Sequence, residues 1–266
     1  ARRRLDIEHA LRGALEQDGF SLAYQPQMDL DAQTVCGIEA LLRWEHPVLG
    51  PCGPDEFIEI AETTGDIVAI GEWVLREACR QAAAWDAAGL AFGRMSVNVS
   101  AVQLRDPGFA QRVLGACSAA GWPPARLELE LTESALLHDT DALWACFGVL
   151  QAAGVGLAVD DFGTGFSSLS YLSRFPVGRL KIDRSFAADL GKGESVVRLL
   201  RALVGLGHAL DMEVVAEGVE SAEAARTLAD IGCDYLQGYY LSRPMTAGAI
   251  MKLPFDTGPG FRSDTA

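Results

Sequence analysis

The order of hydrophobic and polar positions predicts that the chain begins with a helix and a pair of strands. Residues 5–18 place apolar side chains at helical spacing. Two extended runs follow at 20–28 and 34–42, separated by the polar turn Asp29–Gln33. A connection this short joins only antiparallel strands, so we expect a hairpin here.

The remainder of the chain alternates between strand-like and helix-like patterns. Two helices come first, at 54–64 and 66–88. The expected strands are 94–99, 126–132, 155–160, 178–182, 213–217 and 234–238. The expected helices are 107–120, 140–153, 194–210 and 221–231, with shorter helical stretches near 167–173 and 185–190. This alternation predicts a parallel sheet covered by helices.

The number of strands favours one closed architecture over an open one. With the hairpin there are about eight strands, which at this chain length indicates an α/β fold of the TIM-like (β/α)8 barrel type with one antiparallel strand. An open doubly wound sheet is the second interpretation. We expect residues 1–19 to form an N-terminal helix that continues from a linker, 20–254 to form the barrel, and 255–266 to be a loose tail. The chain opens Ala-Arg-Arg-Arg without an initiator Met, so we expect it to be part of a longer protein.

Polar residues interrupt the apolar strands at positions that the fold brings together. They are Glu39, Asn98, Glu130, Asp160, Asp161, Lys181, Asp183, Glu217 and Gln237. Most of them stand at or near the carboxyl end of an expected strand, and in a barrel those ends meet at one rim, where active sites lie. A single glutamate at such a position is usually a solvated rim residue or a helix cap, but six or seven strands with the same feature indicate one shared site.

Bound cations explain how so many acids share one site. Carboxylates at close range raise one another's pKa, and a metal ion relieves that repulsion. Ligands that are all oxygen atoms favour Mg²⁺ or Mn²⁺ over zinc or copper. The adjacent pair Asp160 and Asp161 has the arrangement needed to serve two metal ions, as in enzymes that cleave phosphate diesters.

Charge and cysteine content narrow the class of protein. The 36 acidic residues against 22 basic ones give a formal net charge of −14, which argues against binding long nucleic acids and leaves room for a small anionic substrate held through metal ions. The six cysteines have no CxxC spacing, so neither a zinc site nor a disulfide framework is indicated. No signal peptide and no run long enough to span a membrane is present, and we expect a cytoplasmic location even if the full-length protein is membrane-anchored.

Seven sequence blocks, read in order, resemble the EAL family of bacterial cyclic di-GMP phosphodiesterases. They are EALLRW from Glu39, SVNVS from Ser96, ELTES from Glu130, DDFGTGFSSL from Asp160, KID from Lys181, AEGVE from Ala216 and LQGYYLSRPM from Leu236. The resemblance begins at Tyr24-Gln25-Pro26 and reaches Pro244. EAL alone is a weak tripeptide, but all seven blocks in the family's order form a specific match. The departures, Glu45, Glu59 and Phe166, affect none of the matched ligand positions.

The resemblance assigns roles residue by residue. It implies ligands of a first metal at Glu39, Asn98, Glu130 and Asp160, and of a second at Asp160, Asp161 and Glu217. Lys181 matches a lysine that contacts the attacking water, Glu217 has also been viewed as a base, and Glu133 matches a glutamate that anchors the DDFGTGFSSL loop. The implied substrate contacts are Gln25, Arg43, Asp183, Gln237 and one tyrosine of the pair Tyr239 and Tyr240.

The resemblance also implies an activity and partners. The expected reaction is hydrolysis of cyclic di-GMP to linear 5′-pGpG with two Mg²⁺ or Mn²⁺ ions, in bacterial second-messenger signalling. A homodimer and fusion to an N-terminal sensory or GGDEF domain are expected as well. Two alternatives remain: a receptor domain that binds cyclic di-GMP without cleaving it, and a magnesium-dependent barrel enzyme of the enolase type that acts on a small carboxylate.

Overall fold

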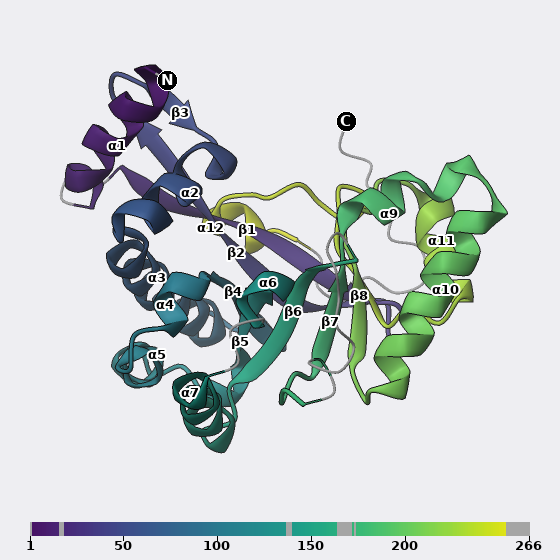
Figure 1. Cartoon of the computed structure of the whole chain (residues 1–266). Helices are drawn as coiled ribbons and strands as arrows, with labels where there is room; N and C mark the ends of the chain where they lie inside the picture. The colour runs from purple at the N-terminus through teal and green to yellow at the C-terminus, as the bar shows by residue number, and fades with distance from the viewer. Residues whose placement is uncertain (1, 16–18, 137–139, 164–171, 173, 254–266) are drawn as a thin grey trace.

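The strands form a single sheet that closes on itself as a barrel (Figure 1). The computed structural model describes residues 2–15, 19–136, 140–163, 172 and 174–253. Within that part of the chain the strands are β1 (Phe20–Asp29), β2 (Thr34–His46), β3 (Gly50–Cys52), β4 (Arg94–Val99), β5 (Leu127–Thr132), β6 (Gly156–Phe162), β7 (Arg179–Ile182), β8 (Glu213–Ala216) and β9 (Tyr235–Leu236). Strand β1 is antiparallel to both β2 and β9, and this double pairing completes the barrel. The predicted TIM-like barrel with one antiparallel strand is confirmed, and the open sheet is excluded.

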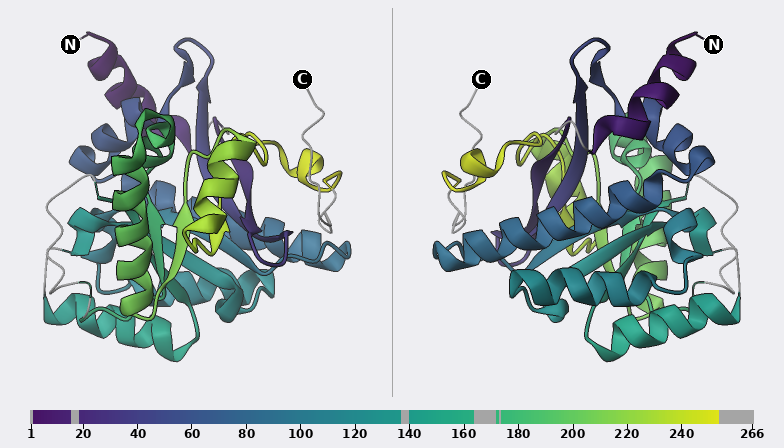
Figure 2. Two further views of the ribbon diagram at one scale, coloured as in Figure 1. Left: turned by 90° about the vertical axis from the view of Figure 1, so that its right-hand side faces the viewer. Right: turned by 90° about the vertical axis from the view of Figure 1, so that its left-hand side faces the viewer.

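Helices cover the outside of the barrel. They are α1 (Arg2–Ala14), α2 (Pro54–Thr64), α3 (Ile67–Ala87), α4 (Ala101–Leu104), α5 (Phe109–Ala120), α6 (Glu133–Leu136), α7 (Asp141–Ala152), α9 (Arg184–Ala188), α10 (Glu194–Ala209), α11 (Ala222–Asp230) and α12 (Ala247–Ile250). Figure 2 shows α3 and α5 on one side of the barrel and α10 and α11 on the other. Among the described helices, none combines the length and the apolar character needed to cross a bilayer.

Several expected boundaries differ from the structure, and short elements account for most of the differences. The first helix begins at Arg2 and ends at Ala14, earlier at both ends than the expected 5–18. Pattern analysis missed β3, α4, α6 and α12, since elements of three or four residues are too short to show a period. Nearly all of the helical stretch expected at 167–173, and the tail expected at 255–266, lie outside the described residues.

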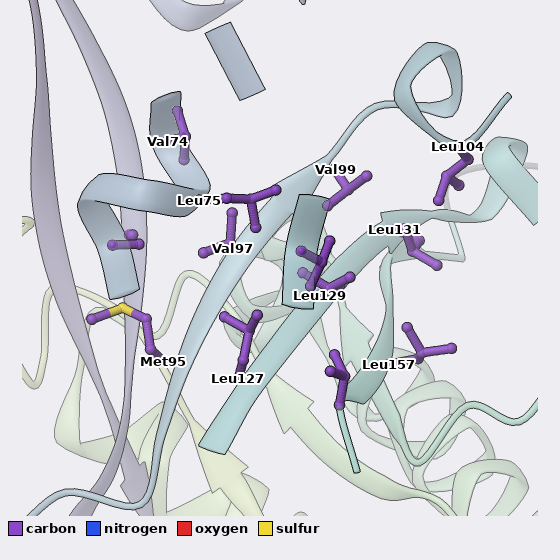
Figure 3. Close-up of a cluster of buried hydrophobic side chains, with 14 of the residues drawn as sticks. Val74, Leu75, Met95, Val97, Val99, Leu104, Leu127, Leu129, Leu131 and Leu157 are labelled. Carbon is purple, nitrogen blue, oxygen red and sulfur yellow. The ribbon is translucent and has the colours of Figure 1, made fainter. Parts of the chain in front are cut away.

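Alternation along β4 and β5 places apolar side chains on the outside of the barrel and polar ones on its inside. In β4, Met95, Val97 and Val99 point outward into the core beneath the helices (Figure 3). The leucines of β5 do the same, and Val74 and Leu75 of α3 belong to the same apolar cluster (Figure 3). The residues between them face the barrel axis, because successive side chains of a strand point to opposite faces. The inside therefore carries the chemistry, and the outside carries the hydrophobic packing.

An ionic cluster fills the amino-terminal half of the barrel interior. Arg179 of β7 is 1% exposed and lies 3.2 Å from Glu128 of β5 and 2.9 Å from Glu213 of β8. Glu128 also accepts hydrogen bonds from Ser96 and Arg94. The guanidinium of Arg179 lies 4.4 Å from the centre of the Tyr235 ring. These contacts hold five strands together beneath the polar groups at the opposite end of the barrel.

Candidate metal centre and substrate cavity

A cavity of about 690 Å³ opens at the carboxyl ends of the strands. This volume lies within the range of about 300–1,000 Å³ that is typical of small-molecule sites. The predicted site residues that line it are Gln25, Glu39, Arg43, Asn98, Glu130, Asp160, Asp161, Glu217, Gln237 and Tyr239. The structure thus brings together residues that are separated by up to 214 positions, 25 to 239, in the sequence.

Four of the lining carboxylates surround one buried lysine. Nζ of Lys181 lies 2.5 Å from Glu130 Oε2, 2.6 Å from Glu217 Oε1 and 3.1 Å from Asp160 Oδ1. Glu39 Oε2 follows at 3.6 Å. Lys181 itself is fully buried and does not line the cavity, so it lies behind the acids. One cation at the barrel axis therefore partly compensates four acids. Three of them lie in β2, β5 and β6, and the fourth directly follows β8.

Asp160, Asp161 and Glu217 form a second, overlapping group. One carboxylate oxygen from each lies within 4.8 Å of the others. The pairing of β6 with β7 shifts register between Val159 and Phe162, so the two aspartates occupy an irregular part of the strand. Asp161 has a positive φ of 54°, and its backbone N–H donates to Asp160 Oδ1 at 3.0 Å. A bulge of this kind re-aims side chains, and here both aspartates reach the same cavity instead of opposite faces of the sheet.

The pKa shifts in this cluster arise first from burial and then from the charges of neighbouring carboxylates. Burial raises the pKa of Glu217 to about 8, and the charge of Asp160 adds to the effect. Burial and the charge of Glu39 raise the pKa of Glu130 well above its usual value, and burial and Asp160 raise that of Asp161. Burial favours the neutral amine of Lys181, but the surrounding carboxylates outweigh it and raise its pKa. One ammonium group does not balance these acids.

The donor set fits divalent cations. Glu130 Oε1 is buried and has no hydrogen-bond partner among the described residues, so a ligand atom is left pointing into the cluster. Asn98 donates its Nδ2 to Glu39 at 2.6 Å, which leaves its carbonyl oxygen for a cation. Carboxylate and amide oxygens are the ligands that Mg²⁺ and Mn²⁺ favour. The chemistry of the residues is therefore consistent with a metal centre.

Two amides, the exposed Asn98 and the buried Gln237, orient the carboxylate of Glu39. Asn98 donates to one of its oxygens, and Gln237 Nε2 donates to the other at 2.5 Å. Gln237 Nε2 also lies 3.1 Å from Gln25 Oε1, while Gln25 donates to the backbone carbonyl of Ser242. Burial by itself would raise the pKa of Glu39, but Lys181 and the two amide donors lower it, so this acid stays ionised.

The structure distinguishes among the predicted substrate contacts. Arg43, Gln25, Gln237 and Tyr239 line the cavity. Asp183 does not; it caps α9 by accepting hydrogen bonds from the backbone and hydroxyl of Ser185. The substrate contact at Asp183 therefore stays a prediction.

The two tyrosines after Gln237 face different surroundings. Tyr239 lines the cavity, is 47% exposed, and lies beneath the guanidinium of Arg243 at 4.3 Å. Tyr240 packs against the hydrophobic cluster around Leu228 instead. The choice that the sequence left open between them falls on Tyr239 as the residue available for stacking.

Two arginines of the cavity lining were absent from the sequence-based candidates. Arg105 and Arg184 line the cavity together with Arg43, and they place positive charge near the acids. Arg184 directly follows Asp183, the last residue of the KID block, so it lies next to a sequence block that was already recognised. Arg105 follows the short helix α4, and no local pattern separates it from a solvated surface arginine.

Glu133 lies outside the cavity lining. It is the first residue of α6, directly after β5, and is half-buried. The loop that it was expected to anchor runs mainly through residues 164–168, which lie outside the described residues. Its role as an anchor therefore stays a prediction.

Comparisons with known proteins identify one family and several similar proteins. The sequence model described as EAL domain matches residues 8–244. The bifunctional diguanylate cyclase/cyclic di-GMP phosphodiesterase MucR of Pseudomonas aeruginosa is 44% identical over 251 residues, covering 94% of this chain and 37% of MucR. The cyclic di-GMP phosphodiesterase NbdA of the same species is 39% identical over 267 residues, covering 99% of this chain and 34% of NbdA. The chain thus spans about a third of the length of these relatives.

A solved structure of a related protein closely matches the fold of this chain. The PaMucR phosphodiesterase in complex with c-di-GMP superimposes with a TM-score of 0.87 at 44% sequence identity. The match covers 92% of this chain and 99% of that one. The fold of this chain therefore has a counterpart whose structure was solved in complex with this dinucleotide.

Proposed function

The chain belongs to the EAL domain family, and from this premise we propose that it is a metal-dependent phosphodiesterase that hydrolyses cyclic di-GMP to linear 5′-pGpG. The observation that carries the proposal is the cluster of carboxylate and amide oxygens at the floor of the cavity, with more negative charge than Lys181 balances. The relatives MucR and NbdA bear the name of this activity. The c-di-GMP complex of PaMucR supports the choice of substrate.

The cluster divides into two overlapping ligand sets. Glu39, Asn98, Glu130 and Asp160 would hold one Mg²⁺ or Mn²⁺ ion, and Asp160, Asp161 and Glu217 would hold a second. When bound, such ions neutralise charge on the phosphate oxygens and lower the pKa of water. The mutual approach of Asp160, Asp161 and Glu217 supports the second set directly.

The remaining residues bind and orient the substrate. Arg43 and Arg184 present guanidinium groups to the cavity, and a planar guanidinium donates two hydrogen bonds to a phosphate. Glu217 accepts the proton that the attacking water loses, at its carboxylate. Lys181 holds Glu217 and Asp160 in place from behind through its ammonium group. Tyr239 stacks on a guanine base, and Gln25, which also lines the cavity, contacts the ligand.

Two features of the whole protein belong to the proposal as well. We infer that the domain works as a homodimer and that further domains regulate it. The coverage of about a third of MucR and NbdA supports the presence of additional domains in proteins of this kind. Sedimentation of the purified chain, with and without cyclic di-GMP, measures the dimer.

One assay tests the activity and separates it from its alternatives. The chain is incubated with cyclic di-GMP and Mn²⁺, and the products are separated by chromatography. Conversion to 5′-pGpG supports the phosphodiesterase. Binding measured by calorimetry without conversion would identify a receptor domain. Neither binding nor conversion, together with turnover of a small carboxylate, would identify an enzyme of the enolase type.

A further inference from the structure

A line of buried amides connects the ionic cluster at one end of the barrel with the acids at the other. Arg179 Nη1 lies 3.3 Å from Gln27 Oε1. Gln27 Nε2 donates to Gln237 Oε1 at 2.9 Å, and Gln237 Nε2 donates to Glu39 Oε2 at 2.5 Å. Exposure along this line is 1%, 0%, 4% and 3%, respectively. We call Arg179, Gln27, Gln237 and Glu39 the amide relay.

The two ends of the amide relay leave its amides a single satisfied orientation. The guanidinium of Arg179 only donates hydrogen bonds, and the carboxylate of Glu39 only accepts them. Gln27 must therefore turn its oxygen to Arg179 and its NH₂ to Gln237, which in turn must turn its NH₂ to Glu39. Reversing either amide would oppose two donors or two acceptors, and buried polar groups left unpaired are costly.

The start of the amide relay is held firmly. Arg179 is bound by Glu128 and Glu213 and lies against the Tyr235 ring. Gln27 lies opposite Gly37 in the β1–β2 register, and a Cβ atom at position 37 would lie only 2.8 Å from Gln27 Oε1. Because Gly37 has no side chain, it leaves room for the amide of Gln27. The position of this amide therefore depends on both Arg179 and Gly37.

We infer that Gln27 is a positioning residue of the metal centre. Gln27 neither lines the cavity nor contacts Glu39, and it acts by fixing the amide of Gln237. The fixed amide donates to Glu39 Oε2 and to Gln25 Oε1, which orients a proposed ligand and a proposed substrate contact together. This inference rests on the proposed function, because Glu39 needs a fixed orientation only if it binds a metal ion.

The test replaces Gln27 and measures metal binding directly. Gln27→Met keeps the length of the side chain and removes both polar atoms, so Gln237 loses the bond that fixes its orientation. Mutation of a group that orients a metal ligand typically lowers metal affinity or activity by about 10-fold to 100-fold. Free Mn²⁺ is measured by electron paramagnetic resonance during titration, and melting temperature, kcat and KM are recorded for each variant. We expect the dissociation constant for Mn²⁺ to rise by about 10-fold or more, kcat to fall, and KM to rise because Gln237 also orients Gln25.

Two further variants complete the test. Gly37→Ala removes no atom of the amide relay but displaces Gln27 Oε1, so it should also weaken Mn²⁺ binding, by less than Gln27→Met does. Ser96→Ala is the matched control: Ser96 is equally buried, and its side chain hydrogen-bonds to Glu128, which is not a member of the amide relay. It should lower the melting temperature while leaving the Mn²⁺ titration within about 2-fold of wild type.

The outcomes separate the amide relay from the proposed function. Superimposable Mn²⁺ titrations of wild type and Gln27→Met would overturn the role of Gln27. If Ser96→Ala weakened Mn²⁺ binding as much as Gln27→Met does, the role of Gln27 would also be overturned, because the loss of affinity would then follow from lower stability alone. A wild-type chain that binds Mn²⁺ but leaves cyclic di-GMP uncleaved overturns the proposed function, and the Mn²⁺ titrations still decide on Gln27. A wild-type chain that binds no Mn²⁺ overturns both.

Discussion

The ammonium nitrogen of Lys181 lies 2.6 Å from Oε1 of Glu217, behind the acids that line the cavity. The same nitrogen contacts Glu130 and Asp160, so one buried cation serves acids from several strands. Buried charges are tolerated when they are paired, and the surplus acids here need further positive charge. The stability of the barrel and the binding of metal ions are therefore coupled through Lys181.

Replacing Lys181 by Met should destabilise the chain, and Mg²⁺ should recover part of the loss. Removing one partner of a buried ion pair costs about 3–5 kcal/mol, because the other charge is left uncompensated. Metal ions bound nearby would supply some of the missing positive charge. Urea unfolding with and without Mg²⁺ measures both effects, with the exposed Lys252→Met as the matched control. A loss of the same size in both conditions would contradict the coupling.

Replacing Asp160 by Asn should abolish hydrolysis and leave the fold intact. Asp160 is the one residue common to both proposed ligand sets, and the change removes its charge while keeping its shape. We expect turnover in Mg²⁺ to fall by about 100-fold or more, as for other losses at a metal centre. Asp230→Asn, the same change at an exposed position of α11, is the control. Near-normal turnover of Asp160→Asn would show that the two-metal assignment is wrong.

Calcium should inhibit the reaction. Ca²⁺ is larger than Mg²⁺ and accepts looser geometry with more ligands, so it would occupy the acids without holding them at the spacing that Mg²⁺ requires. Chromatography of the products with Ca²⁺ as the sole divalent ion, and then with Ca²⁺ added to Mg²⁺, measures the effect. Comparable turnover with Ca²⁺ alone would count against the mechanism.

The sequence predicted the barrel well because its signals are periodic. The strand expected at 94–99 is β4 with the same bounds, and the hairpin connection determined that β1 runs antiparallel. The acids at strand ends converged as expected. The sequence could not show that Asp183 would cap α9, because a residue directly after a strand serves equally well as a cap or as a ligand contact.

The sequence-based prediction missed the ionic cluster in the amino-terminal half of the barrel for a different reason. Glu128 and Arg179 stand two positions before Glu130 and Lys181, so the spacing that marks one inward face was visible in both strands. What the sequence cannot give is the pairing: Arg179 meets Glu128 across 51 positions, and only the barrel's register brings them together. The amide relay depends on the same register, since Gln27 and Gln237 are 210 positions apart.

Removing the ring of Tyr239 should weaken substrate binding. Stacking of a base on an aromatic side chain contributes about 1–3 kcal/mol, which corresponds to a rise in KM of about 10-fold for Tyr239→Ala. Tyr239→Phe keeps the ring and should leave KM nearly unchanged. Tyr240→Ala is the comparison, because Tyr240 packs against the hydrophobic cluster and should affect stability more than KM. A larger effect on KM from Tyr240 would reverse the assignment.

Glu133→Ala tests whether this residue supports the metal centre or only its own helix. Glu133 follows β5 directly and lies three positions beyond Glu130, and it does not line the cavity. As an anchor of the loop after Gly163 it would keep Asp160 and Asp161 in register, so its loss should lower kcat, raise the Mg²⁺ concentration that activity requires, and weaken a homodimer.

The competing explanation is that Glu133 stabilises the first turn of α6, where an acidic side chain favours a helix N-terminus. That role contributes about 1 kcal/mol of stability and leaves activity nearly unchanged. The two explanations differ in what Mg²⁺ does, because a helix end has no dependence on the metal concentration. Activity titrated against Mg²⁺ for wild type and Glu133→Ala therefore decides between them, with the melting temperature recorded in parallel. A displaced curve supports the anchor, and superimposable curves with a lower melting temperature leave only the helix.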